Sequence, residues 1–258
     1  MQVVLIQAEL QQSATTANRA HLTTLMDQHG ADVDLFVLPE TFATGFLGDG
    51  EREPEALEGP SFEWMQQQAR ARRSAICGSL IIAENGQRFN RFVYVDAEGQ
   101  RLAIYDKRHL FGYGGEDQRY TAGRQRVVFA DQGWRICPQI CYDLRFPVWC
   151  RNQHDYDVLL FVANWPIKRV SAWQHLLRAR AIENQAYVIG VNRAGPDGSG
   201  TIYGGCSGVY DPLGVPLVEM GHEPGSARVA IERERLQAVR EQLPFLADAD
   251  PFALSDIE

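Results

Sequence analysis

Residues 158–162 read Val158-Leu159-Leu160-Phe161-Val162, the most apolar run of a 258-residue chain, and such a run predicts a fully buried β-strand. Residues 134–140, before it, and 187–192, after it, also carry strand patterns. A helix that Ser171 caps and that reaches about Asn184 is expected before the last of these strands. Strands that alternate with helices in this way predict an α/β layered fold whose sheets are covered by helices.

The same alternation extends along the rest of the chain. No low-complexity linker divides it, so a single domain over residues 1–258 is the simpler interpretation. Further strands are expected at residues 3–6, 35–38, 75–83, 89–96, 101–105, 126–129, 206–210, 215–219 and 227–231. Further helices are expected at residues 14–29, 61–73 with Ser61 as the cap, around 147–154, and 232–242. Polar or glycine-rich loops are expected at residues 44–60 and 112–123, and an extended tail from about residue 244.

Composition and charge exclude several classes of protein. Hydrophobic residues make up 45% of the chain and charged residues 22%, which is typical of a folded globular protein. Acidic residues outnumber basic ones by 33 to 25, and the net charge of −8 repels phosphate backbones, so nucleic acid is not expected as a partner. The longest apolar runs are far shorter than the ~20 residues of a membrane span. The N-terminus shows no signal-peptide pattern, so a cytoplasmic protein without a membrane partner is expected.

The cysteines predict free thiols and no metal site. Their number is odd, which makes a poor disulfide framework: Cys77, Cys137, Cys141, Cys150 and Cys206. Cys137 and Cys141 are separated by three residues, and no second cysteine pair or regular histidine pair follows them, so zinc is not expected.

Three polar residues follow directly on strongly apolar strands. Glu40 follows residues 37–39, Lys107 follows 103–106 and Cys141 follows 134–140. A thiol, a carboxylate and an amine are the groups that a nucleophile, its base and an oxyanion-stabilising cation require. Each residue also has an ordinary structural role, as a solvated glutamate, a surface lysine or a small buried cysteine. Spacing alone leaves both interpretations open.

The strings around these residues provide more information. Leu38-Pro39-Glu40-Thr41-Phe42, Tyr105-Asp106-Lys107-Arg108-His109-Leu110-Phe111 and Ile140-Cys141-Tyr142-Asp143-Leu144-Arg145-Phe146-Pro147 resemble, in order, the three signature segments of the nitrilase (carbon–nitrogen hydrolase) superfamily. Ala163-Asn164-Trp165-Pro166 and residues 178–185 resemble the segments that follow in that family. The resemblance extends from the first strand to about Glu232.

The resemblance implies a role for each matching residue. Cys141 would be the nucleophile, Glu40 the general base, and Lys107 the cation beside the oxyanion, together with the backbone N–H of Tyr142. Glu116 would match a second glutamate that positions the substrate or water and orients Lys107. Lys107 and a helix starting near residue 144 are expected to favour the thiolate. No metal or organic cofactor is implied. The family fold is a four-layer αββα sandwich, usually paired into a homodimer.

Within the superfamily, residues 141–147 and the short C-terminus resemble the omega-amidase branch, which hydrolyses 2-oxoglutaramate and 2-oxosuccinamate. These small-molecule amides carry a carboxylate, so a cation is expected in the pocket. Arg145 is the first candidate because its planar fork can bind a carboxylate through two hydrogen bonds. Arg145 could equally pair with Asp143 or a nearby glutamate. Lys168 is a second, weaker candidate.

Two other functions remain open. A nitrilase or an N-carbamoyl amide hydrolase would share Glu40, Lys107 and Cys141 but differ in its pocket. A non-catalytic scaffold of the same fold would have no need to keep all three residues.

Overall fold

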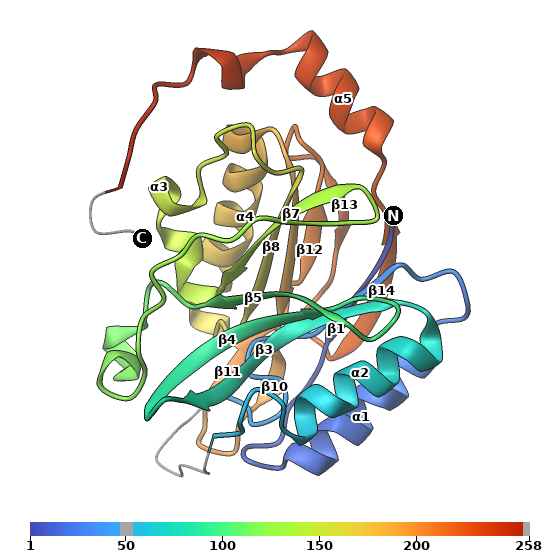
Figure 1. The fold of residues 1–258 in the computed structure, drawn as a ribbon, viewed down its shortest axis with the longest axis vertical. Coiled ribbons are helices and arrows are strands. Elements are labelled where there is room, and N and C mark those ends of the chain that lie inside the picture. Colours follow the sequence, from blue (N-terminus) through green and yellow to red (C-terminus); the bar gives the residue numbers. More distant parts are fainter. Residues whose placement is uncertain (47–53, 255–258) are drawn as a thin grey trace.

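The apolar strands assemble into two six-stranded sheets in the computed structural model, which describes residues 1–46 and 54–254 (Figure 1). The first sheet has the order β14-β1-β2-β3-β4-β5, formed by β14 (Gly225–Ala230), β1 (Gln2–Gln7), β2 (Leu35–Val37), β3 (Ala75–Glu84), β4 (Gln87–Val95) and β5 (Arg101–Asp106). The second has the order β13-β12-β9-β8-β7-β6, formed by β13 (Pro216–Glu219), β12 (Gly208–Tyr210), β9 (Tyr187–Asn192), β8 (Val158–Ala163), β7 (Trp134–Ile140) and β6 (Phe129–Asp131).

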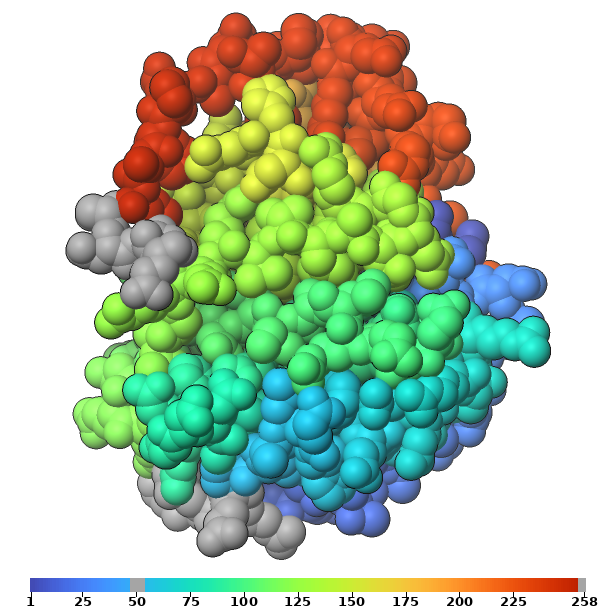
Figure 2. All heavy atoms as spheres, in the orientation of Figure 1, coloured from blue at the N-terminus to red at the C-terminus, as the bar shows by residue number. Residues whose placement is uncertain are grey.

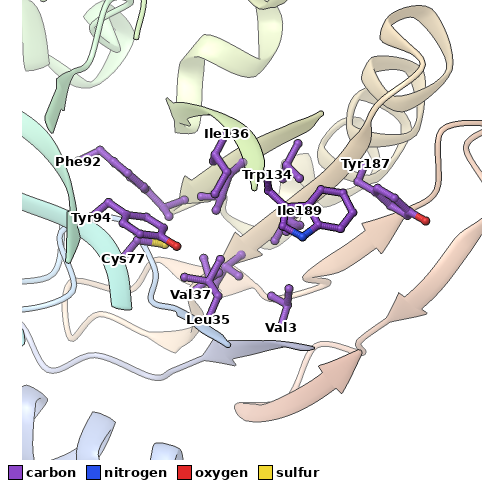
Figure 3. Close-up of a cluster of buried hydrophobic side chains, with 14 of the residues drawn as sticks. Val3, Leu35, Val37, Cys77, Phe92, Tyr94, Trp134, Ile136, Tyr187 and Ile189 are labelled. Carbon is purple, nitrogen blue, oxygen red and sulfur yellow. The ribbon is translucent and has the colours of Figure 1, made fainter. Parts of the chain in front are cut away.

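The two sheets pack face to face around the largest cluster of buried apolar side chains. Val37 and Phe92 of the first sheet face Ile136 and Ile189 of the second, and all four are fully buried (Figure 3). At about 25 cal/mol per Å² of apolar surface removed from water, this interface is the main stabilising contact between the two halves of the chain. Because β2, β8 and β9 are buried on both faces, they are almost continuously apolar.

Helices cover the outer face of each sheet. α1 (Thr15–Asp27) and α2 (Pro60–Arg72) lie side by side on the first sheet and bury Leu22 and Met65 against it. α4 (Val170–Asn184) covers the second sheet with Trp173, Leu177 and Ala181. The layers therefore run helix, sheet, sheet, helix, which confirms the predicted αββα sandwich. Two short elements, α3 (Pro147–Cys150) and α5 (Arg233–Gln242), complete the helices, and within the described residues none is long and apolar enough to cross a membrane.

The strand directions place the ends of several strands at one edge of the sandwich. β1, β2 and β3 are parallel, as are β7, β8 and β9. β5 runs parallel to β3 because β4 is antiparallel to both. The side chain of Asn164, just after β8, donates a hydrogen bond to the backbone oxygen of Glu40, just after β2, at 3.1 Å. The carboxyl ends of the two sheets therefore meet, and in α/β folds this is where functional residues gather.

At the side of the first sheet opposite β5, two strands that are far apart in the sequence, β1 and β14, are neighbours. β14 pairs antiparallel with β1 over their full length, from the partners Gln2 and Ala230 to Gln7 and Gly225. The N-terminal amino group of Met1 adds a hydrogen bond of 2.9 Å to the backbone oxygen of Ile231. The first and last strands of the sandwich are thus neighbours.

The predicted helix caps are wrong. α2 begins at Pro60, since proline fits the first helical position, and Ser61 lies inside the first turn. There the N–H and hydroxyl of Ser61 both donate to the carboxylate of Glu55, at 2.8 and 2.7 Å, so Glu55 caps the helix from outside. Ser171 likewise lies inside α4, which begins at Val170.

Two other expectations need correction, one cannot be compared in full, and one element was not expected. The helix expected around residues 147–154 is the single turn α3, the strand expected at 126–129 lies at 129–131, and part of the 44–60 loop lies outside the described residues. A hairpin that the sequence analysis missed is formed by β10 (Ala194–Pro196) and β11 (Ile202–Gly204).

The tail is not simply extended, because Phe245–Asp248 forms a 3₁₀ turn, η5. The N–H and oxygen of Leu246 pair with Gln185 and His154, at 3.3 and 3.0 Å. η5 is therefore tied to His154 and Gln185, and the red segment that contains it runs across the top of Figure 2.

Candidate active site

Three loops at the shared edge bring four of the predicted residues together. Glu40 lies three residues after β2, Lys107 and Cys141 directly follow β5 and β7, and Glu116 lies in the 3₁₀ turn η2 (Glu116–Gln118). The Nζ atom of Lys107 lies 2.9 Å from Oε1 of Glu40 and 2.8 Å from Oε2 of Glu116. Lys107 and Glu40 are completely buried, and Glu116 nearly so. The result is a buried cation held between two carboxylates.

Burial and charge determine the protonation of this cluster. Burial alone would lower the pKa of Lys107, but the charges of Glu116 and Glu40 raise it well above the ordinary value, so the ammonium persists. Burial also raises the pKa of Glu40, and Lys107 opposes that shift. The Oε2 atom of Glu40 is buried and accepts no hydrogen bond from any described residue. One carboxylate oxygen of Glu40 is therefore held by Lys107, and the other is free to take a proton.

The thiol of Cys141 is neutral at rest. Burial raises its pKa well above the ordinary value, the charge of Glu40 raises it further, and Lys107 only partly offsets both. Lys107 therefore favours the thiolate, as expected, but less strongly than burial and Glu40 oppose it, and the expected contribution of a helix end is wrong. Cys141 itself begins the element that follows β7, the 3₁₀ helix η3 (Cys141–Arg145), which is too short for a strong dipole. A neutral thiol needs a base to remove its proton before it can attack.

A strained turn presents the thiol. Cys141 has φ +49°, in the left-handed region, directly after the extended Ile140 at φ −122°. Asp143, which is completely buried, holds this turn in place. Its Oδ2 accepts hydrogen bonds from the N–H of Ile140 at 3.0 Å and the hydroxyl of Tyr105 at 2.8 Å. Its Oδ1 accepts from the N–H and Nδ1 of His109, at 2.9 and 2.8 Å. Asp143 thus ties the Cys141 turn to the loop that carries Lys107.

Two asparagines that the sequence analysis did not single out also belong to the site. Nδ2 of Asn90, on β4, donates to Oε1 of Glu40 at 2.8 Å and to Oε1 of Glu116 at 3.1 Å. Nδ2 of Asn164 donates to the hydroxyl of Thr41 at 3.0 Å. Asn164 stands in one of the family-like strings, whereas the alternation of residues 89–96, which turns Asn90 inward, was the only signal for Asn90.

A cavity of about 270 Å³ opens above Cys141 and Lys107. Glu40 and Glu116 lie behind it. Aromatic and proline side chains, polar residues and two arginines form its walls: Phe46, Phe111, Tyr113, Gly114, Tyr142, Arg145, Asn164, Trp165, Pro166, Arg169, Asp197, Ser199, Thr201 and Tyr203. The volume of the cavity suits a small molecule. Among the described residues that line the cavity, Cys141 is the one reactive nucleophile.

The two predicted substrate-binding cations are placed differently. Arg145 lines the cavity and stacks on Trp165, and its expected alternative, an ion pair with Asp143, is absent because Asp143 is occupied by other donors. Lys168 is exposed in the 3₁₀ turn η4 (Ile167–Arg169) and does not line the cavity, whereas its neighbour Arg169 does. All five cysteines are free, and in the described part of the chain no cluster of three or more His, Cys, Asp or Glu side chains could hold a metal ion.

Comparison with known proteins gives a consistent result. The family model described as carbon-nitrogen hydrolase matches residues 2–241. Omega-amidase YafV of Yersinia enterocolitica is 43% identical, over 98% of this chain and 98% of that protein. A 2-oxoglutaramate amidase of Bacillus subtilis is 34% identical, over 86% and 87% of the two chains.

A solved structure shares the fold throughout. The crystal structure of a CN-hydrolase superfamily protein from Xanthomonas campestris, with an arsenic adduct in its active site, is 40% identical and covers 99% of both chains with a TM-score of 0.96. This chain therefore belongs to the carbon–nitrogen hydrolase family.

Proposed function

We propose that this protein is an omega-amidase that hydrolyses the terminal amide of small 2-oxo dicarboxylic acid monoamides, such as 2-oxoglutaramate and 2-oxosuccinamate, to the acid and ammonia. The observation that carries the proposal is the buried Glu40–Lys107–Glu116 cluster behind a cavity that holds Cys141 and a stacked, unpaired Arg145. The similarity to proteins named omega-amidase and 2-oxoglutaramate amidase supports the choice of substrate.

The first half of the reaction forms a thioester. Glu40 takes the proton of the Cys141 thiol as sulfur attacks the amide carbon. The carbonyl oxygen gains the negative charge, and the Lys107 ammonium and the N–H of Tyr142 stabilise it; in comparable sites one such donor contributes about 3–4 kcal/mol. When the tetrahedral intermediate collapses, the C–N bond breaks, and the leaving nitrogen takes the proton from Glu40 and departs as ammonia.

The second half reverses these roles. Glu40 takes a proton from water as the water oxygen attacks the thioester carbon. Collapse of the second intermediate releases the acid, and the Cys141 sulfur recovers the proton that Glu40 holds. Glu116 keeps Lys107 in position throughout, because its two carboxylate oxygens accept hydrogen bonds from Nζ of Lys107 at 3.1 and 2.8 Å. In this scheme Arg145 binds the carboxylate at the far end of the substrate.

The test is ammonia release from 2-oxoglutaramate and 2-oxosuccinamate, alongside glutamine, a simple nitrile and an N-carbamoyl amino acid. The wild type should turn over the 2-oxo amides, and Cys141→Ala should turn over none of the compounds. Turnover of only the nitrile or the carbamoyl compound would keep the mechanism and replace the substrate. Activity in Cys141→Ala would refute the mechanism, and a wild type inert toward every compound and toward iodoacetamide would favour the scaffold.

The expected cytoplasmic homodimer stays a prediction. Light scattering on the purified protein should give twice the 29.0 kDa mass of the chain, and a monomeric mass would exclude the dimer.

A further inference from the structure

Two guanidinium groups face the cavity without a carboxylate partner. Arg145 lies over the ring of Trp165, its guanidinium carbon 4.6 Å from the ring centroid, and Arg169 lies over Phe111 at 5.1 Å. Neither guanidinium makes a hydrogen bond or an ion pair with another described residue. Stacking uses the flat face of a guanidinium and leaves its in-plane N–H donors available. Both arginines can therefore donate hydrogen bonds to a ligand.

The acidic groups nearby do not cancel these charges. Asp197 is the one acid among the described lining residues, and its Oδ1 already accepts hydrogen bonds from the N–H and hydroxyl of Ser199, at 2.8 and 2.7 Å, and from the N–H of Thr201 at 3.1 Å. Glu40 and Glu116 lie behind Lys107 and are paired with it. Two guanidinium charges against the single Asp197 carboxylate leave the part of the cavity that Arg145 and Arg169 line with an excess of positive charge.

The number of donors exceeds what a carboxylate alone requires. One guanidinium can bind both oxygens of a carboxylate, so a second one in the same small cavity requires a further acceptor. A 2-oxo acid carries that acceptor on the neighbouring carbon. A 2-amino acid carries an ammonium there instead, which offers no acceptor and is repelled by a guanidinium.

We propose that Arg145 and Arg169 together form a two-guanidinium site for the 2-oxo carboxylate end of the substrate, and that Arg169 determines the preference for a 2-oxo over a 2-amino group. The inference rests on the proposed function for its choice of amide. Arg169 acts in specificity only, since the thiol chemistry uses other residues.

The first experiment compares three five-carbon monoamides that differ only at carbon 2: glutaramate with CH₂, 2-oxoglutaramate with C=O and glutamine with CH–NH₃⁺. Arg169→Ala should lower kcat/KM for 2-oxoglutaramate by about 10- to 100-fold, mainly through KM, as expected for loss of charge-assisted hydrogen bonds. Its preference for 2-oxoglutaramate over the other two amides should shrink by a similar factor.

Lys168→Ala is the matched control, because it removes the same charge one residue away, outside the cavity. This control should keep both kcat/KM and the preference of the wild type. Equal losses of kcat/KM and of preference in Arg169→Ala and Lys168→Ala would mean that only the net charge near the cavity matters, and this result would overturn the inference. An unchanged preference in Arg169→Ala would overturn it as well.

A binding measurement separates this inference from the proposed function. 2-Oxoglutarate, an acid with the same 2-oxo end, should protect Cys141 of the wild type from iodoacetamide at lower concentration than glutarate does. Arg169→Ala should abolish that difference, and Lys168→Ala should retain it. Protection by 2-oxoglutarate without hydrolysis of 2-oxoglutaramate would refute the proposed function and keep the two-guanidinium site. Equal protection by both acids in the wild type would refute the site, whatever the enzyme hydrolyses.

Discussion

Replacement of Asp143 by asparagine should destabilise the protein severely although the shape of the side chain hardly changes. The buried carboxylate accepts four hydrogen bonds, two at each oxygen, from Ile140, Tyr105 and His109. An asparagine has one acceptor oxygen, and its NH₂ group would face two of these donors. At roughly 1.5–3 kcal/mol for each hydrogen bond to a charged group, Asp143→Asn should lower the free energy of unfolding by about 3–6 kcal/mol.

Asp131→Asn is the control, because the Asp131 carboxylate accepts one hydrogen bond, from the Tyr94 hydroxyl, which an amide oxygen can still accept. Urea unfolding should show a loss below about 1 kcal/mol for this variant. In Asp143→Asn, the rate at which iodoacetamide alkylates Cys141 should change as well, because the hydrogen bonds that connect the Cys141 turn to the Lys107 loop are lost. If the two variants unfold within about 1 kcal/mol of each other, the four-bond account of Asp143 is wrong.

Three further predictions concern other parts of the molecule. Burial raises the pKa of Cys137 to about 11, above its ordinary value, so this thiol stabilises the fold at low pH and that contribution is lost as pH rises past 9 toward 11. Between pH 8 and 10.5 the free energy of unfolding should therefore fall by about 2 kcal/mol less in Cys137→Ala than in the wild type. If the free energies of unfolding of the two proteins change with pH in parallel, the effect is excluded. Gly123→Ala should lower the free energy of unfolding by about 1–3 kcal/mol, because the new Cβ would lie 2.1 Å from the backbone oxygen of Asp106. Gly30→Ala places its Cβ in open space and should not lower it, so equal melting temperatures of the two variants would contradict the prediction. Lys107→Met should lower the free energy of unfolding by about 3–5 kcal/mol, because it leaves two buried carboxylates unpaired. The double variant with Glu116→Gln should regain part of that stability but no activity. A single variant as stable as the wild type would count against the role of the Glu40–Lys107–Glu116 cluster.

The sequence predicted the elements whose periodicity is strong. β7, β8 and β9 lie at or within one residue of their expected bounds, because strands buried on both faces must be apolar throughout. The ordered strings around Glu40, Lys107 and Cys141 predicted a shared site, and the three residues do lie at one edge of the sandwich. What composition and spacing could not show is that the residues meet, because that depends on the pairing of strands far apart in the chain.

Other features depend on the exact residue at which a short turn or a helix begins. Lys168 and Arg169 are adjacent cations, and only the 3₁₀ turn that contains them decides which one lines the cavity. The hairpin of β10 and β11 was missed because its strands are three residues long and contain glycine and proline. Ser61 and Ser171 each stand near a helix start, but the first helical residue is set by Pro60 in one case and by the preceding 3₁₀ turn in the other.

The pairing of β1 with β14 sets the order in which the protein can be completed during synthesis. β1 can pair with β2 early in synthesis, but its second partner, β14, is present only when residues 225–230 have been made. Until then β1, whose residues 3–6 are fully buried in the complete fold, is the edge strand of the first sheet, and an apolar edge strand is a surface that recruits foreign strands. A chain that stops before residue 225 would therefore contain Glu40, Lys107 and Cys141 but leave the apolar strand β1 unpaired on one side, an arrangement that favours aggregation. β14, which contributes no residue to the cavity, thus takes the edge position and leaves β1 in the interior of the first sheet.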